Sequence, residues 1–263
     1  MSRIASTFAA LREQHRLALI AYLTVGFPRL DQTAELVRTA AASGADLIEL
    51  GIPFSDPLAD GRTIQAASHQ ALGNGVTVAR ALEAAAAARR LTPVPILFMT
   101  YVNPVLAYGL SAFCDAAAAA GIDGLIVPDL PPAEAGDLRR SAGAAGLGLV
   151  FFVAPTSSPA AIAAACEAST AFVYCVALTG VTGARQSLDP AVIPLIASVR
   201  RMTALPIVVG FGLSRAEHLQ ALEGEADGAI IASALLDAIG QAPDDAPGQV
   251  ARFLEPLRRH PRR

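Results

Sequence analysis

The sequence predicts an α/β protein built as a (β/α)8 barrel, the TIM-barrel architecture, with one domain over residues 1–263. Eight short apolar segments recur along the chain, and helix-like segments separate them at intervals of about 25–30 residues. The apolar segments are continuous rather than alternating, which is typical of strands buried on both faces of a parallel sheet. A doubly wound open sheet is the alternative.

The predicted strands are rich in β-branched and aromatic residues, which favour extended structure. They cover residues 17–26, 46–54, 95–101, 124–130, 148–155, 172–178, 206–212 and 228–233. The segments between them contain good helix formers, including runs of alanine. Predicted helices include residues 33–44, 78–91, 110–121 and 132–146, and glycines stand near their ends, where helices commonly stop.

Three segments depart from the simple alternation of strand and helix. Ile4, Phe8 and Leu11 are spaced to form one apolar helix face, so we expect a short N-terminal helix that closes the bottom of the barrel. An extra helix is predicted over residues 62–72, after the second strand. Residues 258–263 are basic and contain a proline, which indicates a frayed tail.

Composition and charge argue against two classes of partner. The net charge is −3 at pH 7 and the pI is about 5.8, so the chain lacks the basic excess of a nucleic-acid-binding protein. No apolar run reaches the ~18 residues of a membrane-spanning helix, and the N-terminal region lacks a secretory signal pattern. We therefore expect a cytoplasmic protein that acts on a small molecule.

The use of cysteine, histidine and lysine restricts the chemistry. Cys114, Cys166 and Cys175 are scattered, which favours reduced core residues over a disulfide framework or a zinc site. The four histidines are equally dispersed, so no metal site is expected. All 20 basic residues are arginines, and a chain without lysine can form no Schiff base with a substrate or with pyridoxal phosphate.

Two carboxylates stand where a barrel of this kind performs chemistry, at the C-terminal ends of its strands. Glu49 lies inside an apolar strand segment, and Asp60 lies in the loop that follows. Burial raises the pKa of a glutamate so that it can transfer a proton near neutral pH, whereas an aspartate in a more polar loop stays ionised. The alternatives are a structural carboxylate held by backbone donors at Glu49 and an Asp-Gly turn at Asp60.

A phosphorylated substrate with a flat ring fits the remaining rim residues. Segments 179–185, 210–214 and 230–236 follow the last three strands, and Ser233 stands at a predicted helix start, where backbone N–H groups bind anions. The alternative is that these glycines only allow tight turns. Aromatic and apolar residues at strand ends could line a ring pocket or only pack the core; they are Tyr22, Met99, Tyr101, Ile126, Phe152, Tyr174 and Phe211.

Several of these segments together resemble one known family. The chain carries LIELGIPFSDPLADG at 47–61, followed by GRTIQ, and this stretch resembles the signature of tryptophan synthase α subunits. LTVGFP (23–28), MTYVNP (99–104), IVPDLP (126–131), TGVTGAR (179–185) and VGFG (209–212) are similar to further family segments in the same order. The resemblance covers nearly the whole chain.

The resemblance implies a (β/α)8 barrel that takes part in tryptophan biosynthesis. It implies a retro-aldol cleavage of indole-3-glycerol phosphate to indole and D-glyceraldehyde 3-phosphate, with indole passed to a β subunit in an α2β2 heterotetramer. It implies no cofactor on this chain, because the pyridoxal phosphate of this family belongs to the β subunit. A free-standing indole-3-glycerol-phosphate lyase that releases indole is the alternative, and a catalytically idle barrel that acts only as an allosteric partner is another.

The resemblance also implies roles for individual residues. Glu49 would protonate ring carbon C3 and take the glycerol hydroxyl proton, and Asp60 would bind the ring N–H. The implied phosphate-binding positions are Gly183, Gly212, Ala232 and Ser233. The implied indole and glycerol pocket consists of Tyr22, Ile64, Met99, Tyr101, Ile126, Tyr174, Thr182 and Phe211. Contacts to the β subunit fall on Pro53, Asp56, Asn103 and Pro131, and residues 179–190 would form a closing lid.

Four positions depart from the usual residues of the family. Ala232 stands where glycine is usual and Arg62 where proline is usual. Phe27 replaces a more typical polar residue, and Ala177 stands where serine is common. None of these departures falls on the two implied catalytic carboxylates, so the resemblance implies an active enzyme rather than an idle barrel.

Overall fold

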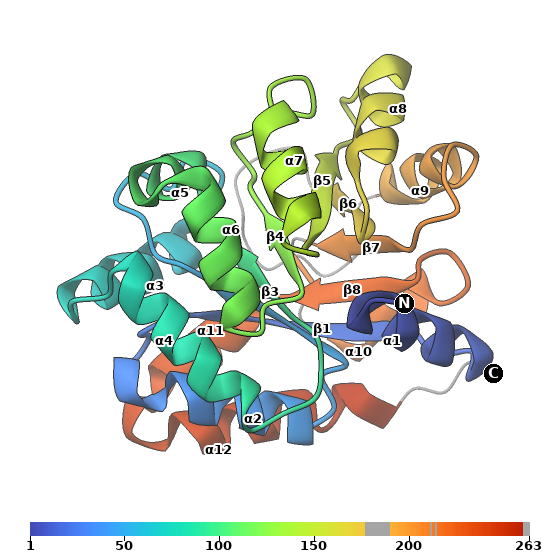
Figure 1. Cartoon of the computed structure of the whole chain (residues 1–263). Helices are drawn as coiled ribbons and strands as arrows, with labels where there is room; N and C mark the ends of the chain where they lie inside the picture. The colour runs from blue at the N-terminus through green and yellow to red at the C-terminus, as the bar shows by residue number, and fades with distance from the viewer. Residues whose placement is uncertain (177–189, 211, 214, 260–263) are drawn as a thin grey trace.

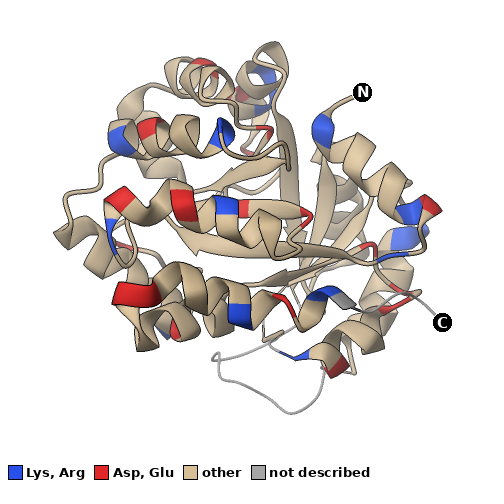
Figure 2. Ribbon diagram, turned by 90° about the horizontal axis from the view of Figure 1, so that it is seen from below, with Lys and Arg blue, Asp and Glu red and all other residues tan. Residues whose placement is uncertain are grey.

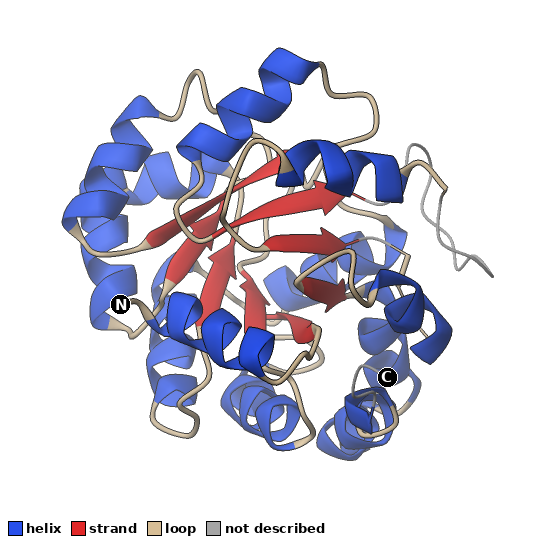
Figure 3. Cartoon of the chain, turned by 90° about the vertical axis from the view of Figure 1, so that its right-hand side faces the viewer, coloured by secondary structure: helices blue, strands red, loops and turns tan. Residues whose placement is uncertain are grey.

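The computed structural model describes residues 1–176, 190–210, 212–213 and 215–259 (Figure 1). Eight parallel strands form a closed barrel in the order β1 to β8, which confirms the predicted (β/α)8 fold. Figure 3 shows the strands at the centre and the helices around them. Within the described ranges, no helix combines the length and the apolar character needed to cross a membrane.

Each strand lies inside the segment that the sequence predicts for it. The bounds are β1 (Ala18–Thr24), β2 (Leu47–Gly51), β3 (Ile96–Met99), β4 (Gly124–Ile126), β5 (Gly148–Val153), β6 (Phe172–Val176), β7 (Ile207–Gly210) and β8 (Gly228–Ile231). The predicted segments run past the C-terminal ends of the strands, because the residues there already belong to loops of the barrel mouth. Nearly all strand residues are buried, as expected for a sheet enclosed by helices.

The helices surround the strands, with the first below the barrel and the others around it. Their bounds are α1 (Arg3–Glu13), α2 (Thr33–Ala42), α3 (Arg62–Gly73), α4 (Val78–Arg89), α5 (Val102–Tyr108), α6 (Leu110–Ala119), α7 (Gly136–Ala144), α8 (Pro159–Ala168), α9 (Val192–Arg200), α10 (Ala216–Leu222), α11 (Ser233–Gln241) and α12 (Ala246–Leu254). Helix α3 is the extra helix predicted after the second strand. A 3-10 helix covers Leu257–Arg259, at the start of the predicted tail, and residues 260–263 lie outside the described residues.

Two helices were not predicted. Helix α5 follows β3 directly, and Pro104 falls in its first turn, where a missing backbone donor is tolerated. Gly109, with a φ of 95°, separates α5 from α6. Helix α12 packs against α2 and α11 (Figure 1). Both helices lie outside the barrel, and its eight strands keep the predicted order.

Helix α1 closes the bottom of the barrel, as predicted. Its buried residues are Ile4, Phe8 and Leu11. The ring of Phe8 meets that of Phe172 edge to face, with centroids 6.0 Å apart. A Cβ atom added to Gly124 or Gly148 would lie 3.3 or 3.6 Å from the Ile4 Cδ1 atom. These two strand glycines therefore leave the space that the helix fills.

Three aspartates at the bottom of the barrel make equivalent hydrogen bonds between neighbouring strands. Each one directly precedes an even-numbered strand and accepts a hydrogen bond from a backbone amide near the start of the strand before it. Asp46 accepts from Leu19 at 2.9 Å, Asp123 from Ile96 at 2.9 Å, and Asp227 from Ile207 at 2.8 Å. At the corresponding place before β6, the Thr170 hydroxyl accepts from the Leu149 amide at 2.8 Å. These side chains tie neighbouring strands together.

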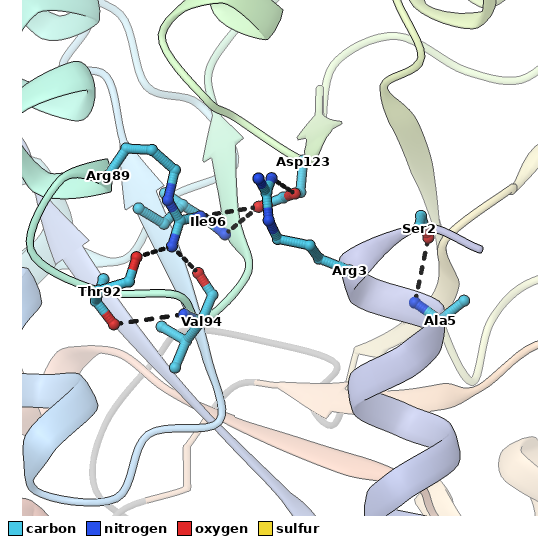
Figure 4. Close-up of polar contacts among 8 residues, drawn as sticks. All are labelled: Ser2, Arg3, Ala5, Arg89, Thr92, Val94, Ile96 and Asp123. Atoms are coloured by element: carbon cyan, nitrogen blue, oxygen red, sulfur yellow. Dashed lines mark hydrogen bonds and ion pairs between the residues drawn. The ribbon is translucent and has the colours of Figure 1, made fainter.

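Arginines form ion pairs with these aspartates. Asp123 lies between Arg3 and Arg89, at 2.8 and 3.3 Å, and Figure 4 shows this cluster. Arg12, in the last turn of α1, pairs with Asp227 at 3.5 Å. Helix α1 is thus held by an ion pair near each end, on top of its apolar contacts.

Charges on the outer helices are mixed. Figure 2 shows acidic and basic residues interspersed over the helices, without a face of basic residues alone in that view. Exposed pairs such as Arg38 with Glu35, at 2.6 Å, lie within single helices. Pairs of this kind contribute little to stability because water screens them.

Candidate active site

The strand register places the predicted site residues on one face of the sheet. Paired residues of neighbouring strands point to the same side, and the side alternates along each strand. Glu49 pairs with Tyr22 of β1. The pairing of neighbouring strands leads from Glu49 to Met99, then to Ile126 and finally to Tyr174. All four residues lie on the same side of the sheet. Because a glutamate and two tyrosines share it with the barrel's apolar filling, this side is the barrel interior.

Glu49 is buried and incompletely satisfied. The residue is 3% exposed, and its Oε2 atom has no hydrogen-bond partner among the residues that the structure describes. Burial, assisted by the nearby charge of Asp60, raises the pKa of Glu49 to about 8. Glu49 therefore holds a proton at neutral pH. An oxygen left without a partner argues against the structural alternative, in which backbone donors satisfy the carboxylate.

Asp60 lies in the loop between β2 and α3. Its amide donates to the Pro57 carbonyl at 3.0 Å and so closes a turn over residues 57–60; Gly61 is the extended N-cap residue of α3, so this turn is not the Asp-Gly turn of the alternative. The Asp60 carboxylate lies near enough to Glu49 and to the Tyr101 hydroxyl for these groups to affect one another's pKa. Burial raises the pKa of Asp60 to about 6, and the Tyr101 hydroxyl opposes this rise. The loop is less polar than predicted, but Glu49 still has the higher pKa, as predicted.

Two tyrosines enclose the carboxylates from other strands. Burial and the charges of the two carboxylates raise the pKa of Tyr22 and of Tyr174 well above the ordinary value. A Cβ atom added to Gly51 would lie 2.1 Å from the Tyr22 hydroxyl oxygen, and one added to Gly210 would lie 2.1 Å from that of Tyr174. Glycine is therefore required at both strand ends, because each tyrosine reaches over the next strand.

The remaining predicted pocket residues also lie at the barrel mouth. Met99, Tyr101 and Ile126, at strand ends, and Ile64, in the first turn of α3, are buried. The ring of Phe152 packs on that of Tyr174 with centroids 4.5 Å apart. An apolar, aromatic wall therefore surrounds the two carboxylates. Such walls accommodate flat apolar ligands.

The predicted phosphate site is described in part. Gly212 has a φ of 75°, in the left-handed region that favours glycine. Ala232 and Ser233 are half-buried at the start of α11, and no side chain caps this end of the helix among the described residues. The backbone amides at this helix start can donate hydrogen bonds to an anion. Thr182, Gly183, Phe211 and residues 179–189 of the predicted lid lie outside the described residues.

The residues predicted to contact a partner follow β2, β3 and β4 at the mouth. Asp56, Asn103 and Pro131 are exposed, whereas Pro53 is buried. An open concavity of about 270 Å³ lies beside Asp56. In the described part of the chain, no group of three or more His, Cys, Asp or Glu residues could hold a metal ion.

Sequence reasoning missed the residues that hold the Asp60 loop. The Gln65 side-chain amide, in the first turn of α3, donates to the Asp60 carbonyl at 2.9 Å. The Ala59 amide donates to the Tyr101 hydroxyl at 3.0 Å. Gln65 ends the GRTIQ stretch, so its short distance from the loop in sequence was a usable signal. The Tyr101 contact joins distant segments and left no local pattern.

Fold and site together define a (β/α)8-barrel enzyme in which a buried proton donor and a second carboxylate meet at the C-terminal ends of the strands. The family model "Tryptophan synthase alpha chain" matches residues 8–261. The chain therefore belongs to the tryptophan synthase alpha chain family, whose members are subunits of an enzyme.

Individual relatives agree over nearly the full length. The chain is 52% identical to the tryptophan synthase alpha chain of Chloroflexus aurantiacus, over 98% of this chain and 97% of the relative. It is 50% identical to that of a Roseiflexus species, over 98% of each chain. A solved tryptophan synthase from M. tuberculosis, in an aminoacrylate-bound form, has a TM-score of 0.89 at 35% identity and 98% coverage of both chains. The comparisons favour the subunit over the free-standing lyase.

Proposed function

We propose that this chain is a carbon–carbon lyase, the α subunit that cleaves indole-3-glycerol phosphate to indole and D-glyceraldehyde 3-phosphate in tryptophan synthesis. One observation carries the proposal. Glu49 is a buried, incompletely satisfied carboxyl group that keeps its proton at neutral pH, and it lies beside the more acidic Asp60. Two carboxyl groups with separated pKa values can act as acid and as charge stabiliser in one reaction.

In the first step, Glu49 donates its proton to ring carbon C3 of the substrate. The ring becomes an indolenine cation and serves as the electron sink for the later bond cleavage. Asp60, ionised above its pKa of about 6, accepts the hydrogen bond of the ring N–H and stabilises the positive charge. The raised pKa of Glu49 supports this assignment, because an ordinary glutamate would hold no proton to donate near pH 7.

In the second step, the carbon–carbon bond between C3 and the glycerol chain breaks. The Glu49 carboxylate takes the proton of the adjacent glycerol hydroxyl, whose carbon becomes the aldehyde. The bonding electrons return to the ring and regenerate neutral indole. Glu49 recovers the proton that it gave up, so the cycle closes without lysine, metal or cofactor. General acid–base catalysis of this kind supplies about 10²–10⁴ in rate.

The substrate binds between the aromatic wall and the start of α11. The phosphate is held by backbone groups of Gly183, Gly212, Ala232 and Ser233. An alanine at 232 keeps the amide donor that a glycine would offer. The ring and glycerol are held by Tyr22, Ile64, Met99, Tyr101, Ile126, Tyr174, Thr182 and Phe211. Support comes from the uncapped start of α11 and from the burial of the described pocket residues.

The proposed partner is a tryptophan synthase β subunit in an α2β2 heterotetramer, which receives the indole and carries the pyridoxal phosphate. It contacts Pro53, Asp56, Asn103 and Pro131. Support comes from the exposure of Asp56, Asn103 and Pro131 on loops of one rim. Because Pro53 is buried, we assign it to the shape of its loop rather than to a large direct contact.

We place the protein in the cytoplasm as one domain over residues 1–263. The support for the compartment is that Cys114, Cys166 and Cys175 are unpaired and buried. Reduced cysteines are typical of a reducing compartment. The support for one domain is the closed barrel that the strands form.

The direct test is turnover of indole-3-glycerol phosphate with and without the cognate β subunit. We expect slow cleavage alone and faster cleavage in the complex, because a partner that orders rim loops completes the site. Absence of cleavage in both conditions would contradict the lyase assignment. Full activity alone, unchanged on mixing, would instead favour the free-standing lyase.

A further inference from the structure

The loop that carries Asp60 has little regular structure of its own. Residues 52–61 between β2 and α3 are turns, bends and irregular backbone. The Asp60 carboxylate nevertheless lies near enough to Glu49, Tyr22 and Tyr174 to raise the pKa of each. A carboxylate that must meet one substrate atom needs support from more rigid elements.

Tyr101 supplies contacts to this loop at three points. Its hydroxyl accepts a hydrogen bond from the Ala59 amide at 3.0 Å and lies near the Asp60 carboxylate, whose pKa it lowers. Its ring packs against that of Phe54, with centroids 5.5 Å apart. Tyr101 is 3% exposed, whereas Ala59 is exposed and Asp60 is half-buried, so a buried residue supports a loop that faces solvent.

We propose that Tyr101 is a positioning residue for Asp60, whose hydroxyl fixes the Ala59–Asp60 peptide and orients the carboxylate. The inference rests on the proposed function only in giving Asp60 its chemical role. A hydroxyl that accepts a hydrogen bond from the Ala59 amide keeps its own proton for the neighbouring carboxylate, so it can act on both groups at once. The proposal gives Tyr101 a task that lining a ring pocket would not require.

Tyr101 is itself anchored from a third loop. It directly precedes α5, and the Val102 amide at the start of that helix donates to Asp129 Oδ1 at 2.9 Å. Asp129 lies in the loop after β4. The orientation of Asp60 therefore depends on contacts that link the loops following β2, β3 and β4.

The Tyr101 hydroxyl also affects the ionisation of Asp60. A hydrogen bond donated to a carboxylate favours its charged form and lowers its pKa, which is the direction found for Tyr101 acting on Asp60. The other titratable groups that interact with Asp60 are Glu49, Tyr22 and Tyr174, and none of them donates a compensating positive charge. Removing the hydroxyl should therefore raise the pKa of Asp60.

The first test is the variant Tyr101→Phe in the complete enzyme, which keeps the ring and removes the hydroxyl. We expect kcat to fall roughly 10- to 100-fold, with a smaller change in KM. The acidic limb of the pH profile should move to higher pH, so that the loss is greater at pH 6 than at pH 8. Tyr108→Phe is the matched control, because it removes an exposed tyrosine hydroxyl from α5; it should leave both limbs in place.

The second test is independent of activity. Amide hydrogen exchange at Ala59 should accelerate roughly tenfold in Tyr101→Phe, since its acceptor is lost, and should not change in Tyr108→Phe. Asp129→Ala should accelerate the same amide, and Asp129→Asn, which retains an acceptor oxygen, should restore slow exchange.

The two tests separate the two proposals. Unchanged Ala59 exchange together with an unmoved acidic limb in Tyr101→Phe would overturn the positioning role. A wild-type protein that does not cleave indole-3-glycerol phosphate would refute the proposed function, yet the exchange experiment would still decide whether Tyr101 holds the loop.

Discussion

The bottom and the mouth of the barrel both carry buried carboxylates, but the two ends treat them differently. At the bottom, Asp123 accepts a backbone amide and pairs with two arginines. At the mouth, Glu49 has neither a partner for one oxygen nor an arginine beside it among the described residues. Burial alone therefore does not identify a functional carboxylate. The distinguishing feature is whether the surroundings satisfy it.

The difference follows from the tasks of the two ends. A paired and hydrogen-bonded carboxylate stays charged, and removing its partner leaves an uncompensated buried charge. An unsatisfied carboxyl group instead keeps its proton and is destabilising for the fold. The paired aspartates at the bottom of the barrel thus stabilise the fold. Glu49 at the mouth destabilises it but can exchange a proton.

The largest expected effect comes from removing the proton donor at the mouth. Glu49→Gln has nearly the same shape but cannot cycle a proton, so cleavage should fall by at least ~10³-fold. Binding of glycerol phosphate should persist, because the phosphate site lies on other strands. Steady-state turnover and calorimetric titration measure the two properties, and near-normal turnover would refute the acid–base role.

Asp60→Asn should have the next largest effect. The amide cannot carry the negative charge that balances the indolenine cation, so we expect a loss of at least ~10²-fold in kcat. Rates should be compared at pH 8, where wild-type Asp60 is ionised. A loss smaller than about fivefold would mean that Asp60 serves the turn rather than the reaction.

At the bottom, Asp123→Asn should show the opposite pattern. Its side chain is 6% exposed and pairs with Arg89, which is 14% exposed, so the neutral amide should lower the free energy of unfolding by about 2–3 kcal/mol. The kcat/KM of the folded protein should stay near wild type. Asp137→Asn, in a pair that is 76% exposed on the aspartate side, is the control and should change stability by less than about 0.5 kcal/mol. A large loss of activity in Asp123→Asn would contradict the claim that the carboxylates at the bottom serve stability and not the reaction.

A smaller, graded effect is expected from pH. Activity requires ionised Asp60, with a pKa of about 6, and protonated Glu49, with a pKa of about 8. The kcat/KM should therefore fall on the acid side as Asp60 gains its proton and on the alkaline side as Glu49 loses its own. A profile that is flat between pH 5 and 9 would contradict both assignments.

The strands, the plugging helix and the position of Glu49 could be predicted because their signals are local. A charged residue in a continuous apolar segment already marks Glu49, and a helical period of apolar residues marks α1. The bottom aspartates were missed although each directly precedes an apolar strand, a repeated signal at Asp46, Asp123 and Asp227. Their meaning depends on amides and arginines elsewhere in the chain.

The parts of the site that could not be predicted depend on contacts between distant segments. The extent to which burial raises the pKa of Asp60, the hydroxyl of Tyr101 against Ala59, and the burial of Pro53 all follow from how loops fold over the mouth. Periodicity and turn signals describe single segments and do not reveal such contacts. The helix α5 was missed for a related reason, since MTYVNP continues an apolar strand and Pro104 masks the helix start.

The most direct test of the central claim is the titration of the Glu49 carboxyl group itself. Carboxyl ¹³C resonances of labelled wild-type protein can be followed from pH 4 to 10, and the signal absent from Glu49→Gln identifies the residue. A transition near pH 8 would show that the mouth holds a protonated acid. A transition at the ordinary value of about 4.3 would contradict the account, because Glu49 would then be charged at neutral pH and would have no proton to donate.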